Sequence, residues 1–183
     1  IARNNGYRNR ESNFFVKQAS HVVFSENISG TSFDLRGPGE MHKGGAMGYQ
    51  YGPRDVWFIN NQISDSASGI TVGSDGVEVT ENAYFIGNVI YNLHKNAADP
   101  TPQGAINIGG GRNHYILNNT IDDVDSGIYI LPNGENYISG NIITNTNSAG
   151  GDYYGQMTLH AERGGLNPHI SNNLAKLIGI EGN

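Results

Sequence analysis

The sequence predicts an all-β protein, a solenoid of about six coils with an asparagine at the same turn of each coil. Three observations predict it: a phrase ending in asparagine recurs six times, strand-like runs fill each repeat, and glycine and asparagine are abundant. The recurring residues are Asn27, Asn61, Asn88, Asn119, Asn141 and Asn173. They lie 34, 27, 31, 22 and 32 residues apart, a repeat length typical of solenoids.

Composition supports this class and excludes others. The chain has 183 residues, of which 26 are glycine and 24 are asparagine, and 37% are hydrophobic. Both residues disfavour helix interiors and are accepted in turns. The net charge of −6 argues against a nucleic-acid-binding surface, and no apolar run approaches membrane-spanning length.

The first strand of each coil is predicted from an alternating apolar pattern. Gly45 to Ile63 overlays Gly104 to Ile121 with one insertion, which aligns these strands between coils. An apolar residue at every second position is the pattern of a half-buried strand. The six predicted first strands are 14–16, 47–49, 70–72, 106–108, 128–130 and 157–159.

A second strand precedes each recurring asparagine, and a short third strand follows it. An apolar residue always lies three positions before the asparagine: Phe24, Phe58, Phe85, Ile116, Ile138 and Ile170. The predicted third strands include 62–63, 89–90, 120–121 and 142–143. Three strands and three turns per coil predict a right-handed parallel β-helix. We expect the asparagines to adopt strained turn angles and to form a hydrogen-bonded ladder between coils.

With this pattern the chain resembles the pectate-lyase-like superfamily and the right-handed β-helix repeat regions of secreted carbohydrate-active proteins. The resemblance covers nearly the whole chain. It implies a substrate groove on the side of the turns between third and first strands. Those connections are short at 64–68 and 122–126 and long at 29–45, 91–104 and 144–155, so we expect any function in the long loops.

The outward positions of the first strands and the long loops form a candidate polysaccharide surface. Aromatic rings stack on the apolar faces of sugars, while amides and charged groups bind hydroxyl and carboxylate groups. The residues predicted to bind substrate are His42, His94, Asn107, Tyr129, Tyr153 and Tyr154.

One enzymatic version of this surface is a lyase acting on a uronic-acid polymer. β-Elimination needs a base for the C5 proton and a positive or hydrogen-bonding group for the developing enolate. Lys43 or Lys95 is the candidate base, and Arg112 or Asn107 is the candidate for the carboxylate. The sequence leaves open whether the surface is catalytic or only binds.

A calcium site is predicted from clustered carboxylates, because Ca²⁺ takes several oxygen ligands. Asp122, Asp123 and Asp125 lie together in one short turn, and Asp65 is expected in the same turn of a neighbouring coil. Acidic turn residues that only contact solvent are the alternative.

An apolar stripe is predicted on the outward side of the second strands. The residues that flank the inward apolar position include Trp57, Ile59, Tyr84, Ile86, Tyr115, Leu117 and Tyr137. A patch of this size is seldom left uncovered. It is either an aromatic ladder that stabilises the sheet or a contact surface for another chain or domain.

Residues 1–183 are expected to form a single β-helix domain, either an interior fragment or an uncapped segment of a larger protein or assembly. The opening segment 2–12 looks like a turn, and neither end shows a polar cap, although open solenoid ends are normally capped. The function predicted is extracellular carbohydrate binding or processing. The alternative is a structural or adhesive extracellular protein that assembles through the aromatic stripe or its ends.

Overall fold

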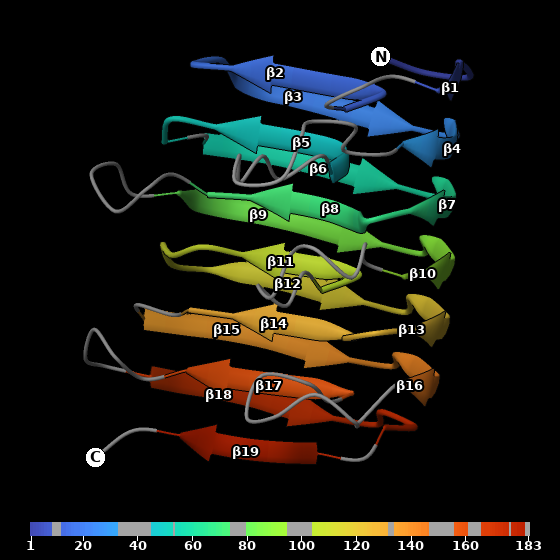
Figure 1. The fold of residues 1–183 in the computed structure, drawn as a ribbon. Coiled ribbons are helices and arrows are strands. Elements are labelled where there is room, and N and C mark those ends of the chain that lie inside the picture. The colour runs from blue at the N-terminus through green and yellow to red at the C-terminus, as the bar shows by residue number, and fades with distance from the viewer. Residues whose placement is uncertain are drawn as a thin grey trace, which may run out of the picture.

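The fold is a stack of parallel coils in three sheets, confirming the predicted β-helix (Figure 1). The computed structural model describes residues 1–8, 12–32, 45–52, 54–73, 80–94, 104–131, 134–146, 156–160, 166–175 and 177–181. Every strand pair in these ranges is parallel, and each coil contributes its strands to the same three sheets as its neighbours. Within these residues no helix is both long and apolar enough to cross a membrane.

The three sheets follow the predicted order of first, second and third strands. In the described residues the first-strand sheet comprises β2 (Phe14–Lys17), β5 (Gly45–Gln50), β8 (Ser68–Val72), β11 (Ile106–Ile108), β14 (Ile128–Ile130), β17 (Met157–His160) and β19 (Leu177–Glu181). The second-strand sheet comprises β3 (Ser20–Ser25), β6 (Arg54–Ile59), β9 (Glu81–Ile86), β12 (His114–Leu117), β15 (Gly134–Ser139) and β18 (Leu166–Ser171). The third-strand sheet comprises β1 (Asn5–Tyr7), β4 (Ile28–Ser32), β7 (Gln62–Ser66), β10 (Val89–Leu93), β13 (Thr120–Val124) and β16 (Ile142–Thr146).

The opening segment differs from its prediction as a turn. Residues 5–7 form β1, which pairs with β4 and extends the third-strand sheet. Hydrogen bonds to the next coil outweigh the local turn preference of Asn5 and Gly6, because a strand edge offers unpaired donors and acceptors.

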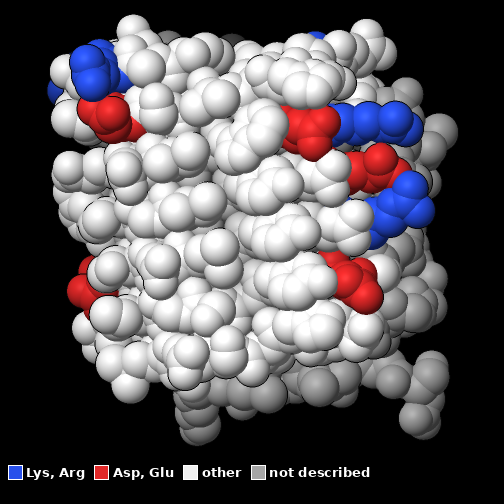
Figure 2. All heavy atoms as spheres, turned by 180° about the vertical axis from the view of Figure 1, so that it is seen from behind, with Lys and Arg blue, Asp and Glu red and all other residues white. Residues whose placement is uncertain are grey.

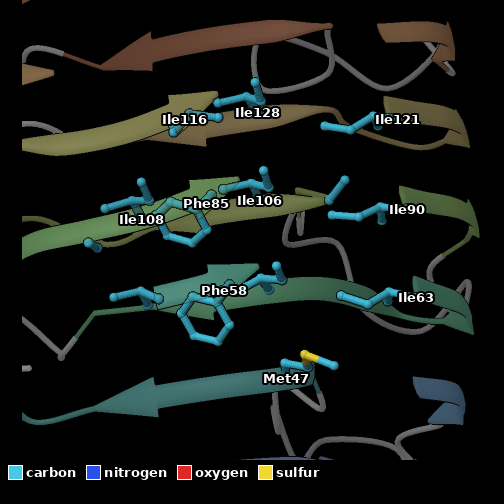
Figure 3. Close-up of a cluster of buried hydrophobic side chains, with 14 of the residues drawn as sticks. Met47, Phe58, Ile63, Phe85, Ile90, Ile106, Ile108, Ile116, Ile121 and Ile128 are labelled. Carbon is cyan, nitrogen blue, oxygen red and sulfur yellow. The ribbon is translucent and has the colours of Figure 1, made fainter. Parts of the chain in front are cut away.

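The core is filled by matching columns of inward side chains from the three sheets. Phe24, Phe58 and Phe85 stack with ring centroids 4.8 and 5.4 Å apart, and all three are fully buried. Isoleucines from all three sheets pack around these rings (Figure 3). The predicted inward position therefore holds, and burial of each such side chain contributes about 2 kcal/mol.

The recurring asparagines form the predicted ladder. In each step the backbone N–H and the side-chain Nδ2 of one asparagine donate to Oδ1 of the asparagine in the next coil. The Asn61–Asn88 and Asn88–Asn119 steps have donor–acceptor distances of 2.9–3.0 Å. Nδ2 also donates to the carbonyl of the apolar residue three positions before the preceding ladder asparagine, as Asn88 does to Phe58. The ladder thus satisfies buried backbone groups that the turn would leave unpaired.

The strained turn angle lies one residue earlier than predicted. The residue before each ladder asparagine has a positive φ, such as 53° at Asn60, 65° at Gly87 and 55° at Asn118. The ladder asparagines themselves are not among the residues with positive φ. In each Asn-Asn pair the first residue therefore supplies the left-handed conformation, which asparagine and glycine tolerate best, and the second supplies the hydrogen bonds.

His114 is a buried polar residue at an inward position of β12. Its side chain is fully buried, and Nε2 lies 3.3 Å from the carbonyl oxygen of Gly110, to which the neutral ring donates. Nδ1 has no hydrogen-bond partner. Burial lowers the pKa of His114 to about 4, because a second proton would place a charge on an unpartnered nitrogen inside the core.

Replacing Asn88 with alanine should lower the free energy of unfolding by about 3 kcal/mol, because several buried groups lose their partners. Urea unfolding followed by circular dichroism measures this change. The matched control is Asn118→Gly, a change at the exposed left-handed position, which should shift stability by under about 1 kcal/mol. Equal losses in both variants would show that the ladder is not a main source of stability.

Acidification should destabilise the protein through His114. The folded pKa lies below the unfolded value of about 6.5, so the stabilisation is present above that pH and is lost as the pH falls towards about 4. The full loss is about 3 kcal/mol. Urea unfolding at a series of pH values should show a shallower loss for His114→Leu than for the original protein. Parallel curves would contradict the assignment.

Candidate functional site

The predicted outward column of the first-strand sheet is present. Strand register aligns Phe15, Gly48, Thr71, Asn107, Tyr129 and Thr158 in successive coils. Asn107 and Tyr129 are half-buried, whereas Thr158 is fully covered. Of the column's aromatic residues, Phe15 is the more exposed, with 41% of its surface accessible.

A lysine and two exposed aromatic rings form what we call the lysine–aromatic cluster: Phe15, Lys17 and Tyr51. Lys17 Nζ lies 5.4 Å from the centroid of the Phe15 ring and 5.5 Å from that of Tyr51. The Phe15 ring covers Gly48, where a Cβ atom would come within 2.6 Å of Cδ2. Glycine at this position therefore gives the ring room to lie against the sheet.

The sequence reasoning missed Lys17 and Tyr51 as candidates. Lys17 follows Phe15 by two residues and so shares its outward side, a signal that strand alternation contains. Tyr51 lies just beyond β5, at a positive φ of 67°. No periodic pattern specifies that conformation, so its position next to Lys17 could not be read from the sequence.

His94 lies between two carboxylates where β10 ends. Its Nδ1 is 3.3 Å from Asp125 Oδ1, and its Nε2 is 3.4 Å from Asp123 Oδ1. Burial acts to lower the pKa of His94, but hydrogen bonds and charges from Asp125 and Asp123 outweigh it, and the pKa is raised. The structure brings His94, a predicted substrate-binding residue, together with two of the predicted calcium ligands.

The other two predicted calcium ligands contact polar neighbours. Asp122 accepts hydrogen bonds from Thr144 Oγ1 at 2.6 Å and Asn145 Nδ2 at 2.8 Å, and these bonds lower its pKa. Asp65 accepts from Ser64 and from Asn92. It lies two coils from Asp122, not in the neighbouring coil as predicted, because β10 lies between β7 and β13. Among the described residues, no group of three or more histidine, aspartate or glutamate side chains is arranged to hold a metal ion. The calcium prediction gains no support from these contacts.

Arg112, the alternative to Asn107 as the group for the substrate carboxylate, lies beside the second-strand sheet, whereas Asn107 is in the first-strand sheet. Arg112 pairs with Glu81, whose other oxygen is 3.6 Å from Arg54 Nε. Arg112 therefore belongs to a charged row beside the second-strand sheet. The remaining predicted site residues, His42, Lys43, Lys95, Tyr153 and Tyr154, lie outside the described residues.

The predicted aromatic stripe is present as a continuous stack. The ring centroids of Trp57, Tyr84, Tyr115, Tyr137 and His169 follow one another at 5.3, 4.7, 4.9 and 4.6 Å, with interplanar angles of 7° or less. The first four of these rings, together with Ile59, Ile86 and Leu117, are named the aromatic face. Because the rings cover each other's faces, they present mainly edges to solvent, which suits flat packing better than stacking on sugars.

Hydroxyl groups at the edge of the stack meet acidic side chains. Tyr137 Oη donates to Glu135 Oε2 at 2.7 Å, and this hydrogen bond is the main cause of the raised pKa of Tyr137. Burial is the main cause of the raised pKa of Tyr84, with smaller effects from Tyr115 and Asp55. Tyr84 and Tyr137 therefore stay neutral over a wide pH range.

Comparison with known proteins matches the chain to one family model. The model describes a right-handed β-helix region and matches residues 44–179. No curated protein and no solved structure matches the chain.

The His94 ring should titrate above its ordinary pKa of about 6.5, as NMR of the imidazole protons would show. Asp125→Asn should lower this pKa, because it removes the negative charge and leaves only a neutral hydrogen-bond acceptor. The contribution of His94 to stability is present below the unfolded pKa and is lost as the pH rises through the raised folded value. An unchanged titration in Asp125→Asn would contradict the contact.

Proposed function

This chain belongs to the family of right-handed β-helix regions, and on that premise we propose that it binds an acidic polysaccharide. The binding surface is the outward side of the first-strand sheet. Because one scaffold hosts many functions, the proposal depends on a site and not on the fold. The observation that carries it is the lysine–aromatic cluster.

The cluster has the chemistry needed to recognise a uronic-acid unit. The accessible surfaces of Phe15 and Tyr51 offer apolar rings for the sugar's C–H groups, and Lys17 offers an ammonium for the carboxylate. This positive group stands out on a chain whose net charge is −6. The ammonium group of a lysine binds a carboxylate as a point charge, and contact with the two rings restricts its position before the ligand binds.

The column beyond the cluster extends the surface along the coils. Asn107 and Tyr129 lie on the same outward side and are half-buried, whereas Thr158, the next residue of the column, is fully covered. Successive coils are about 4.8 Å apart, so a linear polymer lying along the column meets a regular series of side chains. Binding by several sugar units increases affinity through effective concentration.

The proposed function is binding, because the described contacts supply groups that recognise a sugar. The candidate bases Lys43 and Lys95 lie outside the described residues, and Arg112 is held by Glu81 beside another sheet. If the surface also catalysed a lyase reaction, the product would be an unsaturated uronate, which absorbs ultraviolet light. Acidic polysaccharides are abundant outside cells, so the proposal includes an extracellular or cell-surface location.

Binding is tested with polygalacturonate and with its fully methyl-esterified form, which lacks the carboxylate charge. Isothermal titration calorimetry should detect binding of the acidic polymer and weaker binding of the ester. Lys17→Gln should weaken binding of the acidic polymer by about tenfold or more, since hydrogen bonds to charged groups contribute about 1.5–3 kcal/mol. Tyr51→Ala should weaken binding of both polymers.

The matched control is Arg3→Gln, which removes the same charge from an exposed arginine paired with Glu26. If Lys17→Gln and Arg3→Gln lost equal binding affinity, the effect would be nonspecific electrostatic attraction, which would contradict the proposed site. An absence of binding to any uronic-acid polymer, with the fold intact by circular dichroism, would reject the function. Release of ultraviolet-absorbing product would add catalysis to it.

A further inference from the structure

The aromatic face lies in a band without charged side chains. Strand register aligns the four rings in one column and the three aliphatic side chains in a second, parallel column of the second-strand sheet. Viewed from behind, charged residues lie to either side of an uncharged band (Figure 2). Across the asparagine turn the band continues onto the third-strand sheet, where Val89 and Ile142 are each 44% exposed.

The turn beside the aromatic face is flat because asparagine and glycine alternate along it. Asn60 Oδ1 lies where a Cβ atom on Gly87 would be, at 2.4 Å, and Asn118 Oδ1 stands in the same relation to Gly140, at 2.2 Å. Each glycine therefore accommodates the asparagine side chain of the preceding coil. Larger residues at these glycines would push those side chains outward.

A row of alternating charge borders the face. Arg54, Glu81 and Arg112 are in register in successive coils. In the next coil Glu135 lies one residue beyond the register position, which Gly134 holds. In coil order the charges are positive, negative, positive, negative. The order is self-complementary, since the same row read backwards places each arginine opposite a glutamate. Asp55 shares the register column of Glu135 and is engaged by His21 and Asn82, as Glu135 is by Tyr137.

We propose that the aromatic face binds a second copy of this chain, with the two coil stacks antiparallel. The two-fold axis runs along the strand direction, between the coils of Tyr84 and Tyr115. A two-fold interface is isologous, so each column meets its own reversed copy. Tyr84 then lies opposite Tyr115 of the second copy, and Ile86 lies opposite Leu117. The charged row pairs Arg54 with Glu135 and Glu81 with Arg112 across the axis.

The charges select this orientation over a parallel one. A two-fold axis along the stack would place the charged row against the uncharged margin that carries Val89 and Ile142. Arg54 and Glu135 would then be desolvated without gaining a charged partner across the interface, which is unfavourable. The antiparallel orientation keeps apolar columns against apolar columns and gives both residues a partner of opposite charge.

The size of the face sets the expected strength of association. The four coils of the face, at about 4.8 Å each, and a strand-plus-turn width of roughly 28 Å give an area of roughly 540 Å² per copy. Specific interfaces bury about 800 Å² per partner. The dimer should therefore be weak and reversible, with a dissociation constant in roughly the micromolar range.

Sedimentation velocity over a wide concentration range tests the proposal on the full chain. The original protein should show a reversible monomer–dimer equilibrium, and Ile86→Lys should abolish it by placing a charge near the axis. Arg54→Glu and Glu135→Arg should each weaken dimerisation at least tenfold, because each creates two like-charged pairs across the interface. An equimolar mixture of the two variants should restore the dimer, since every cross pair is then of opposite sign.

The mixture isolates the antiparallel contact from effects within one chain. Arg54 and Glu135 are three coils apart, roughly 14 Å, so neither substitution repairs the other within a chain. Thermal unfolding of each variant separates lost folding from lost association. A monomer at all concentrations, a dimer unaffected by Ile86→Lys, or a mixture that fails to recover would each overturn the proposal. Loss of polygalacturonate binding in Lys17→Gln is independent of all these outcomes.

Discussion

The hydrogen-bonded ladder of asparagines is the constraint on which the rest of the structure depends. Each asparagine binds the backbone and side chain of its neighbours, so every coil must pass this corner in the same conformation. Coils vary in length from 22 to 34 residues, and this variation therefore cannot lie at the asparagine turn. The extra residues enter at the other two corners, where loops lengthen at little entropic cost.

A fixed corner also fixes the register of everything near it. Three residues before each ladder asparagine the side chain points inward, and its two neighbours point outward. Phe58 and Phe85 stack inside the core for the same reason that Tyr84 and Tyr115 stack outside it. The aromatic face is thus a direct product of the ladder, whereas the lysine–aromatic cluster is farther along the coil and depends on Gly48 to accept a ring.

What could be predicted follows from what repeats. The inward column, the outward rings and the ladder recur at constant offsets, so the sequence alone was sufficient to place them. The left-handed residue was assigned one position too late, because in pairs such as Asn60–Asn61 both residues tolerate that conformation. The pairing of Arg112 with Glu81 was not predicted, because no repeating pattern specifies the direction of a side chain in a turn. Tyr51 was missed for the same reason.

The two exposed sides of the coil stack differ in what they can bind. On the first-strand sheet, exposed rings lie under an ammonium group, and the outward column mixes aromatic, amide and hydroxyl groups. On the second-strand sheet, the rings stack face to face, and the charged side chains lie in a row along one edge. A sugar needs a free ring face and hydrogen-bonding partners, whereas a flat protein surface needs matched apolar columns and matched charges. The two sides can therefore act at once, and an antiparallel pair would leave both lysine–aromatic clusters accessible at opposite ends of the assembly.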